Sequence, residues 1–164
     1  MNPDVMLEKR IKDLMLDLGT LERISPQTKV SEAVKVLSEK RQTRCPSFLL
    51  VVDEAEIEEK ILGMLSIDDV LAHMEPSTMS MEELPIFWRG QFREECEAIL
   101  ERSASEIMSP VTHVIHQSGT LMEAVHLMNS SRIDWLPVVE GEDVVGILFR
   151  EELFNGVVEV VKPE

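Results

Sequence analysis

The chain carries an internal duplication, and this repeat limits its fold more than any other feature. Residues 29–46 and 120–137 align without a gap. The matching residues are Glu32, Ala33, Val34, Arg41 and Pro46 in the first copy, and Glu123, Ala124, Val125, Arg132 and Pro137 in the second. Apolar residues recur at i, i+3, i+4 and i+7 in both copies, which predicts an amphipathic helix in each. The duplication therefore indicates two similar structural units.

Each predicted helix is followed by a hairpin. Apolar runs at 47–53 and 61–66 surround an acidic turn in the first copy, and runs at 138–140 and 144–149 surround the turn at 141–143 in the second. This pattern is typical of antiparallel strands. With an extended stretch ahead of each repeat, both halves follow the order helix or coil, strand, helix, strand, strand, helix. The fold class is therefore α+β (α/β).

The repeats divide the chain into three predicted segments. Residues 1–74 would hold an N-terminal helix and the first unit, residues 75–104 a loop and a helix, and residues 105–164 the second unit. Short helices at 67–74 and 150–157 would close the two units. Because a unit of about 60 residues buries little surface alone, we expect the units to pack together as a pseudo-twofold pair.

The segment at 75–104 has no counterpart in the duplication, and it carries an aromatic cluster of Phe87, Trp88 and Phe92. These rings have two interpretations. They would dock the linker onto the body of the protein, which is the commoner arrangement, or they would form an exposed patch for a partner subunit.

The net charge of −15 argues against several classes of partner. Nucleic acid requires basic residues to neutralise its phosphates, and an anionic membrane surface attracts them as well. A small anionic ligand stays compatible, because a few local basic residues can override the overall field. Two cysteines, Cys45 and Cys96, indicate neither a disulfide framework nor a zinc site. No membrane span or signal peptide is evident, so we expect a cytoplasmic protein with reduced thiols.

The chain also lacks residue patterns typical of catalysis or metal binding. His113 and His116 lie three apart on a predicted strand, where they would point to opposite faces, so we expect no shared metal. No Ser-His-Asp set, nucleophile elbow or Walker-type phosphate loop is present. We therefore expect no enzymatic activity and no catalytic cofactor.

Four segments in order resemble the CBS domain, which is named after cystathionine β-synthase. They are SEIM (105–108), TLMEAVHLM (120–128), RIDWLPVVE (132–140) and VVGILFREEL (144–153). The resemblance covers about residues 10–74 and 104–160, and a tandem pair of this kind is called a Bateman module. It implies two β-α-β-β-α units paired through their sheets, with up to two ligand sites in the cleft between them.

The resemblance also implies a function. Members of this family bind AMP, ADP, ATP or S-adenosylmethionine in that cleft, and they act as sensors, including sensors of cellular energy, rather than as catalysts. Their modules often pair again into homodimers. Since this chain would carry no effector domain, the regulated partner would be a protein in another chain.

The family's ligand motif is a glycine, two apolar residues, Ser or Thr, two further residues and Asp. The first unit completes this motif with Gly63, Ser66 and Asp69. The resemblance implies that Asp69 accepts hydrogen bonds from ribose hydroxyls and that Ser66 lies near phosphate, at a helix N-terminus. The same pair is also a capping box, which would begin a helix without any ligand.

The second unit departs from the motif. Gly146 keeps the glycine, Phe149 replaces the hydroxyl residue, and Glu152 carries its carboxylate one methylene farther from the backbone. Phe149 would either fill the second cleft or stack on a ligand base. We therefore expect the two sites not to be equivalent.

The resemblance implies further ligand contacts near the start of each unit and at the proline that follows its first helix. These contacts fall on Thr20, Leu21, Arg23 and Pro46 in the first unit, and on Thr112, Val114 and Pro137 in the second. Arg23 would supply a positive charge to a phosphate, or it would simply face water. An alternative function for the whole chain is a ligand-free dimerisation scaffold, with Phe149 plugging one cleft.

Overall fold

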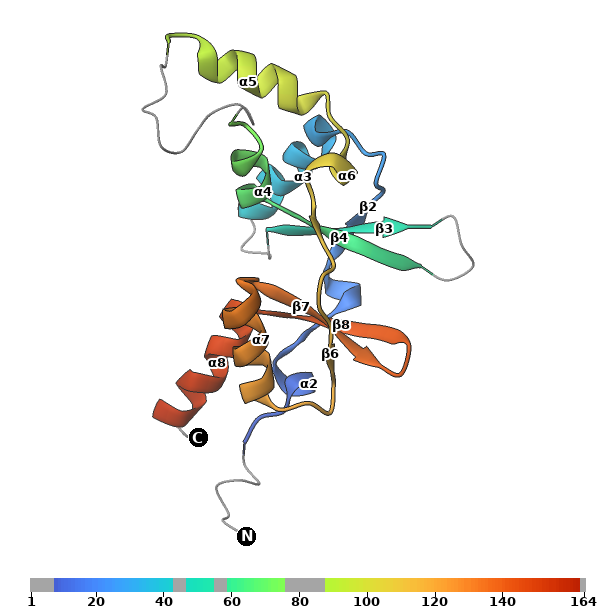
Figure 1. Cartoon of the computed structure of the whole chain (residues 1–164), viewed down its shortest axis with the longest axis vertical. Helices are drawn as coiled ribbons and strands as arrows, with labels where there is room; N and C mark the ends of the chain where they lie inside the picture. The colour runs from blue at the N-terminus through green and yellow to red at the C-terminus, as the bar shows by residue number, and fades with distance from the viewer. Residues whose placement is uncertain (1–7, 43–46, 55–58, 76–87, 163–164) are drawn as a thin grey trace. The chain divides into compact units, whose positions relative to one another are not determined.

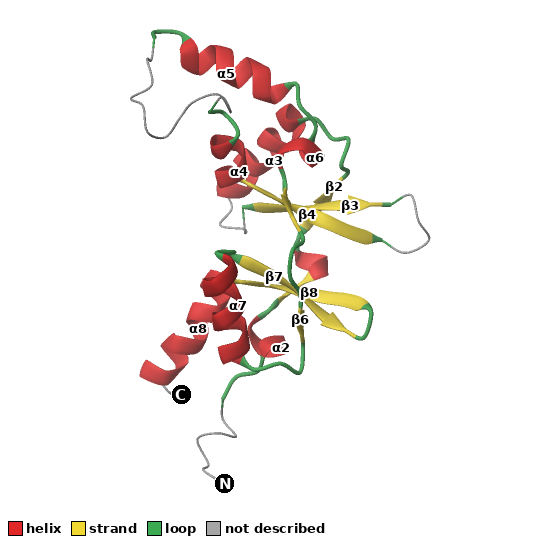
Figure 2. Ribbon diagram, in the orientation of Figure 1, coloured by secondary structure: helices red, strands yellow, loops and turns green. Residues whose placement is uncertain are grey.

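The structure is a computed structural model, and it describes residues 8–42, 47–54, 59–75 and 88–162. The chain forms two compact units, and each combines a four-stranded sheet with helices (Figures 1 and 2). The first-repeat unit comprises residues 21–110, and the second-repeat unit comprises residues 1–20 and 111–164. The predicted α+β fold class is confirmed.

The sheet of the first-repeat unit has the order β2-β3-β4-β5. Its strands are β2 (Glu22–Ile24), β3 (Phe48–Asp53), β4 (Lys60–Ser66) and β5 (Ser109–Pro110). Helix α3 (Val30–Gln42) connects β2 to β3, which are parallel, because a parallel pair requires a crossover connection. β3 and β4 form the predicted antiparallel hairpin, and β5 pairs antiparallel with β4.

One face of this sheet is covered by helices. They are α3, α4 (Ile67–Ala72) and α6 (Ala104–Ile107), while α5 (Gln91–Leu100) packs against α3. The predicted apolar stripe of α3 is confirmed, since Val30, Ala33 and Leu37 are all buried and pack with Leu49 and Val51 of β3. This cluster is the core beneath the ligand motif.

The second-repeat unit has the sheet order β1-β8-β7-β6. Its elements are α2 (Ile11–Leu14), β1 (Leu16–Asp17), a 3₁₀ turn (Leu18–Thr20), β6 (Ile115–His116), α7 (Leu121–Ser131), β7 (Trp135–Glu140), β8 (Asp143–Phe149) and α8 (Arg150–Val161). Thr120 caps α7, because its Oγ1 accepts a hydrogen bond from the Glu123 backbone N–H at 3.1 Å. Ala124 and Met128 of α7 are buried in the core of this unit.

The boundaries of the two compact units differ from those of the predicted segments 1–74 and 105–164. β1 pairs with β8 of the second repeat, and β5 pairs with β4 of the first. Ile11, from the N-terminal α2, lies in the second-repeat core, and Ile107, from α6, lies in the first-repeat core. The short helix and strand ahead of each repeat therefore complete the sheet and core of the other.

The gapless alignment of the repeats is wrong beyond the first helix of each unit. The strand register makes Trp135 equivalent to Phe48, Phe149 to Ser66, and Pro137 to Leu50. Pro46 lies outside the described residues and is not the counterpart of Pro137. The second repeat is four residues shorter between the start of its helix and the start of its strand, because α7 has 11 residues against 13 in α3, and three residues rather than five connect the helix to the strand. β7 consequently begins at Trp135, ahead of the predicted start at residue 138.

The linker segment is docked by its C-terminal part. Ile99 of α5 is buried in the first-repeat core. The Val30 backbone N–H donates to the Arg102 carbonyl at 2.8 Å, and the Ala104 N–H donates to the Thr28 carbonyl at 2.7 Å. These bonds attach the end of the linker to the start of α3.

The aromatic residues of the linker do not take part in this docking. Trp88 and Phe92 are 53% and 72% exposed, so the prediction that these two rings anchor the linker is wrong, and Phe87 lies outside the described residues. Within the described part of the chain, no helix is both long and apolar enough to span a lipid bilayer.

Candidate functional site

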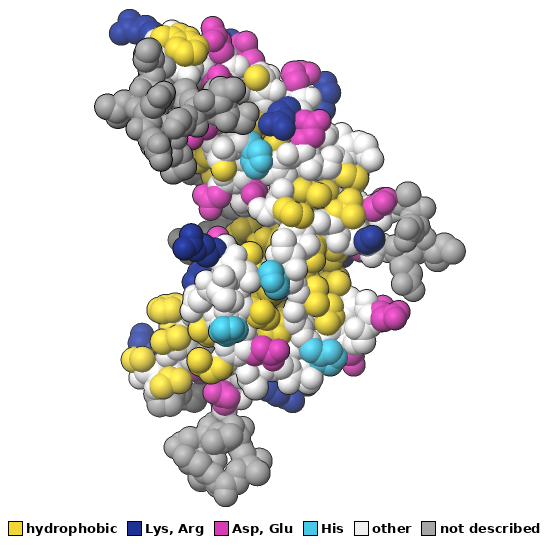
Figure 3. Space-filling view, viewed as in Figure 1, with side chains coloured by type: hydrophobic (Ala, Val, Ile, Leu, Met, Phe, Trp, Pro, Cys, Tyr) yellow, Lys and Arg dark blue, Asp and Glu magenta, His cyan; other side chains and the backbone are white. Residues whose placement is uncertain are grey.

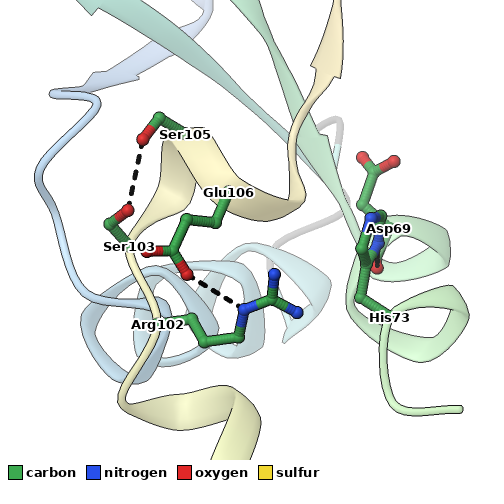
Figure 4. A network of polar contacts seen from close by, with 6 residues as sticks. All are labelled: Asp69, His73, Arg102, Ser103, Ser105 and Glu106. Atoms are coloured by element: carbon green, nitrogen blue, oxygen red, sulfur yellow. Dashed lines mark hydrogen bonds and ion pairs between the residues drawn. The ribbon is translucent and has the colours of Figure 1, made fainter. Parts of the chain in front are cut away.

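The motif residues Gly63, Ser66 and Asp69 lie where β4 passes into α4. Leu65 is fully buried in the core and holds the end of the strand. Ser66 has an extended backbone and is the N-cap of α4, so the helix begins directly after the motif hydroxyl. Asp69, in the first turn of α4, is half-buried and Asp68 beside it is exposed. Figure 4 shows Asp69 on α4 and His73 at the C-cap of the same helix.

Ser66 and Asp69 form the predicted capping box. The Ser66 backbone N–H donates to Asp69 Oδ2 at 2.8 Å, and the Asp69 N–H donates to Ser66 Oγ at 3.4 Å. The Ser66 hydroxyl also donates to Asp69 Oδ2 at 3.0 Å. Such a cap contributes about 1 kcal/mol to helix stability. The predicted capping box is therefore confirmed.

A third side chain, Ser109, belongs to this cluster and was not predicted from the sequence. Its hydroxyl donates to Asp69 Oδ1 at 2.5 Å. Ser109 lies on β5, where it stands opposite Met64 of β4. The ligand contacts predicted for this segment fall instead on Thr112 and Val114. The sequence does show a hydroxyl residue, Ser109, ahead of Pro110. Its contact with Asp69 could not be predicted, because it depends on the pairing of β5 with β4.

The hydrogen bonds to Asp69 show how many acceptor positions of its carboxylate are occupied. A carboxylate offers about four lone-pair positions. The described residues donate three hydrogen bonds to Asp69, two to Oδ2 from Ser66 and one to Oδ1 from Ser109. One further hydroxyl can therefore bind without displacing any of them. A vicinal pair of hydroxyls requires that one of the three bonds be released.

Gly63 has a steric role that does not depend on any ligand. A Cβ at this position would overlap the Ser109 backbone carbonyl and lie 2.9 Å from Met108 Sδ. At Gly146, a Cβ would lie 2.8 Å from the Leu16 carbonyl and 2.6 Å from Met15 Sδ. In both units the glycine thus allows the strand from the other repeat, β5 at Gly63 and β1 at Gly146, to approach the hairpin closely.

The equivalent position in the second-repeat unit has a different chemistry. Phe149 is the N-cap of α8, is 4% exposed and makes no side-chain cap bond. Glu152 accepts a hydrogen bond from Asn155 at 3.1 Å. Leu16 stands opposite Ile147, in the register position that Ser109 occupies in the other unit. The hydroxyl and carboxylate cluster is therefore a property of the first motif.

The other predicted contacts are distributed across the fold. Arg23 forms an ion pair with Glu59, so its charge is already compensated. Leu21 is buried, while the Thr20 hydroxyl donates to the Asp17 carbonyl at 2.7 Å within the second-repeat unit.

In the second repeat, Thr112 and Val114 are exposed and Pro137 is buried in β7. Pro46 lies outside the described residues. The residues that the structure brings together in one cluster are Ser66, Asp69 and Ser109, with Gly63 beneath β5.

Metal binding gains no support from the described side chains. Among them, no three His, Cys, Asp or Glu residues lie close enough to hold a metal ion. His113 and His116 bond instead to neighbouring hydroxyls, those of Thr112 and Ser118.

The family model of the CBS domain matches this chain twice, at residues 11–76 and 104–159. The chain belongs to the CBS domain family. The two matches make it a tandem CBS pair, and pairs of this kind are regulatory modules. The predicted family is thus confirmed, with both repeats included.

Known CBS proteins resemble the chain over most of its length. The CBS domain-containing protein CBSX2, chloroplastic, of Arabidopsis thaliana is 24% identical over 159 residues, which cover 92% of this chain and 64% of that protein. The chain thus spans somewhat less than two thirds of this relative.

Solved structures share the fold. A crystal structure of CBSX2 in complex with AMP has a TM-score of 0.63 at 22% identity and covers 93% of this chain and 98% of that one. A putative acetoin utilization protein (AcuB) from Vibrio cholerae has a TM-score of 0.61 at 18% identity, covering 94% of this chain and 93% of that one. Both support the CBS-pair fold.

We expect that removal of the Ser109 hydroxyl loosens the Asp69 carboxylate. Ser109→Ala should lower the melting temperature by a few degrees, because a hydrogen bond to a charged group contributes about 1.5–3 kcal/mol. Ser109→Thr keeps the hydroxyl and should restore most of this loss. Thermal unfolding followed by circular dichroism measures both variants. Equal destabilisation by alanine and threonine would instead indicate that only the packing of β5 matters.

Proposed function

We propose that this CBS pair binds an adenosine-containing ligand (AMP, ADP, ATP or S-adenosylmethionine) at Gly63, Ser66 and Asp69. The observation that carries this proposal is the half-buried Asp69 carboxylate, which retains an acceptor position beside a complete family motif. The resemblance to a CBS-pair structure in complex with AMP supports the same class of ligand. No catalytic cofactor is part of this proposal.

The hydrogen bonds suggest how a ribose would enter. The Ser66 backbone N–H keeps Asp69 Oδ2 in place, so the Ser66 hydroxyl can turn away without freeing the carboxylate. A ribose diol then takes the released position and the unused one on Asp69. The Ser66 hydroxyl becomes available to a phosphate or another acceptor on the same ligand. Ser66 and Asp69 would thus cap the helix in the free protein and contact the ligand once it binds.

The ligand would act by linkage. A ligand that binds one conformation or one association state more tightly shifts the equilibrium toward that state. We expect the module to be a homodimer of CBS pairs and to report to a regulated protein in another chain, as a cytoplasmic sensor of energy or metabolite level. Neither nucleic acid nor a membrane is part of this mechanism, since the net charge of −15 disfavours both.

A ligand-free scaffold is the second candidate function. The buried Phe149 at the second motif favours it, because no hydroxyl there can contact a ligand. The complete capping box at the first motif is also stable without a ligand.

Melting the protein with each of the four ligands separates the two functions. A ligand at about 100 times its dissociation constant adds about 2.7 kcal/mol of stability. A clear upward shift of the melting temperature with at least one of them is expected. Unchanged melting with all four at millimolar concentration would favour the scaffold.

Asp69→Ala should abolish most of the binding. Loss of two hydrogen bonds to a charged group corresponds to about 3 kcal/mol, or roughly a hundredfold in the dissociation constant. Asp68→Ala is the matched control, since this carboxylate lies in the same turn of α4 and is exposed. Calorimetric titration measures both variants. Weakening by Glu152→Ala with no effect of Asp69→Ala would place the ligand at the other motif.

A further inference from the structure

The start of α5 presents two aromatic and two basic side chains to solvent. Trp88 is 53% exposed, Phe92 is 72% exposed, and Arg89 and Arg93 are exposed beside them. We refer to these four residues as the aromatic–arginine patch. Apolar and basic side chains lie next to each other over this end of α5 in the upper left of Figure 3. The patch lies in the linker, which neither repeat contains.

The patch is built on a fixed part of the first-repeat unit. Gly90 has a φ of 95°, a left-handed conformation that glycine adopts without strain, and it is the N-cap of α5. The Gln91 N–H donates to the Trp88 carbonyl at 3.2 Å, and Gln91 itself is buried. Ile99 anchors the same helix in the core. The backbone that carries the two aromatic residues is therefore defined by this turn and by the helix that follows it.

The charge of the patch is opposite to that of the chain. Residues 88–93 contain two arginines and no acidic residue, whereas the chain has 31 acidic and 16 basic residues. Arg93 forms an ion pair with Glu97 at 3.1 Å, but both side chains are largely exposed. An exposed i,i+4 pair contributes only about 0.3–0.5 kcal/mol. A carboxylate on another protein can therefore replace Glu97.

We propose that the aromatic–arginine patch is a docking site for an acidic segment of another protein, with carboxylates next to apolar side chains. Aromatic residues and arginine are enriched at protein interfaces, and Trp and Arg dominate their binding energy. Opposite charges would steer such a segment to this patch. A second copy of this chain is the alternative occupant, and the sedimentation experiment below distinguishes it from a separate acidic partner. This proposal does not depend on ligand binding at Asp69.

The test uses the full chain and two labelled synthetic peptides. One peptide alternates leucine with glutamate, and the other has lysine in place of every glutamate. Fluorescence anisotropy should show at least tenfold tighter binding of the glutamate peptide. Trp88→Ala and Phe92→Ala should each weaken it about tenfold, and Arg89→Glu with Arg93→Glu should reverse the preference in favour of lysine. Phe154→Ala is the control, because Phe154 is a similarly exposed aromatic residue on α8, at 61%.

Three results would overturn the proposal. The first is equal binding, or no binding, of the two peptides. The second is glutamate-peptide binding that survives Trp88→Ala and is lost with Phe154→Ala. The third is self-association of the wild-type chain in sedimentation experiments that Trp88→Ala abolishes, since the patch would then be an interface between copies.

Discussion

Replacing Ile107 with alanine should unfold the first-repeat unit more easily, although Ile107 precedes the second repeat in the chain. Its side chain is fully buried in the first-repeat core. Truncation of a buried isoleucine costs about 2–5 kcal/mol. Hydrogen exchange should therefore accelerate in α3 and β3, because local opening follows the stability of the unit that contains them. The protection of α7 and β7 should change much less.

Ile11→Ala is the matched control, since Ile11 is equally buried and occupies the same place in the other exchanged segment. Its expected effect is the reverse, with faster exchange in α7 and β7. If Ile107→Ala instead accelerated hydrogen exchange only in residues 111–162, Ile107 would not belong to the first-repeat core as described.

Gly63→Ala should be among the most destabilising single-methyl substitutions in this chain. The added Cβ would overlap the backbone carbonyl of Ser109, and backbone cannot turn away as a flexible side chain can. Overpacking of this kind costs about 1–3 kcal/mol or more. Displacement of β5 would also withdraw the Ser109 hydroxyl from Asp69. Chemical denaturation measures the stability, and ligand titration measures the site.

Gly19→Ala is the control for this substitution, because a Cβ at Gly19 meets no atom within 4 Å. It should leave stability unchanged or raise it by about 0.4–1 kcal/mol, through the lower entropy of the unfolded chain. Gly146→Ala should resemble Gly63→Ala, since it meets the Leu16 carbonyl. Stability that is equal in Gly63→Ala and Gly19→Ala would show that β5 adjusts readily.

Much of the local structure follows directly from the residues. The apolar stripe of α3, the hairpin of β3 and β4, and the cap formed by Ser66 and Asp69 depend on neighbours within a few positions. Periodicity and capping patterns report such short-range interactions. The equivalence of Pro46 and Pro137 was wrong, because a gapless alignment cannot detect that both the helix and the connection after it are two residues longer in the first repeat.

The aromatic residues of the linker illustrate a second limit. Hydrophobic rings are buried often enough that docking was the natural expectation for Trp88 and Phe92. Burial depends on what surrounds a residue in three dimensions, and here Ile99, rather than the two rings, packs α5 into the first-repeat core. An exposed aromatic residue is therefore recognised only from coordinates.

The residues alone are enough to predict a pair of related α+β units whose two motifs differ. Repeat spacing and residue identity carry that information, as Ser66 and Phe149 show. The pairing of β5 with β4 and of β1 with β8, and with it the bond from Ser109 to Asp69, becomes visible only in the folded chain. Ser109 and Asp69 are 40 residues apart in the chain. No local pattern encodes such a contact, because it arises from the packing of whole elements.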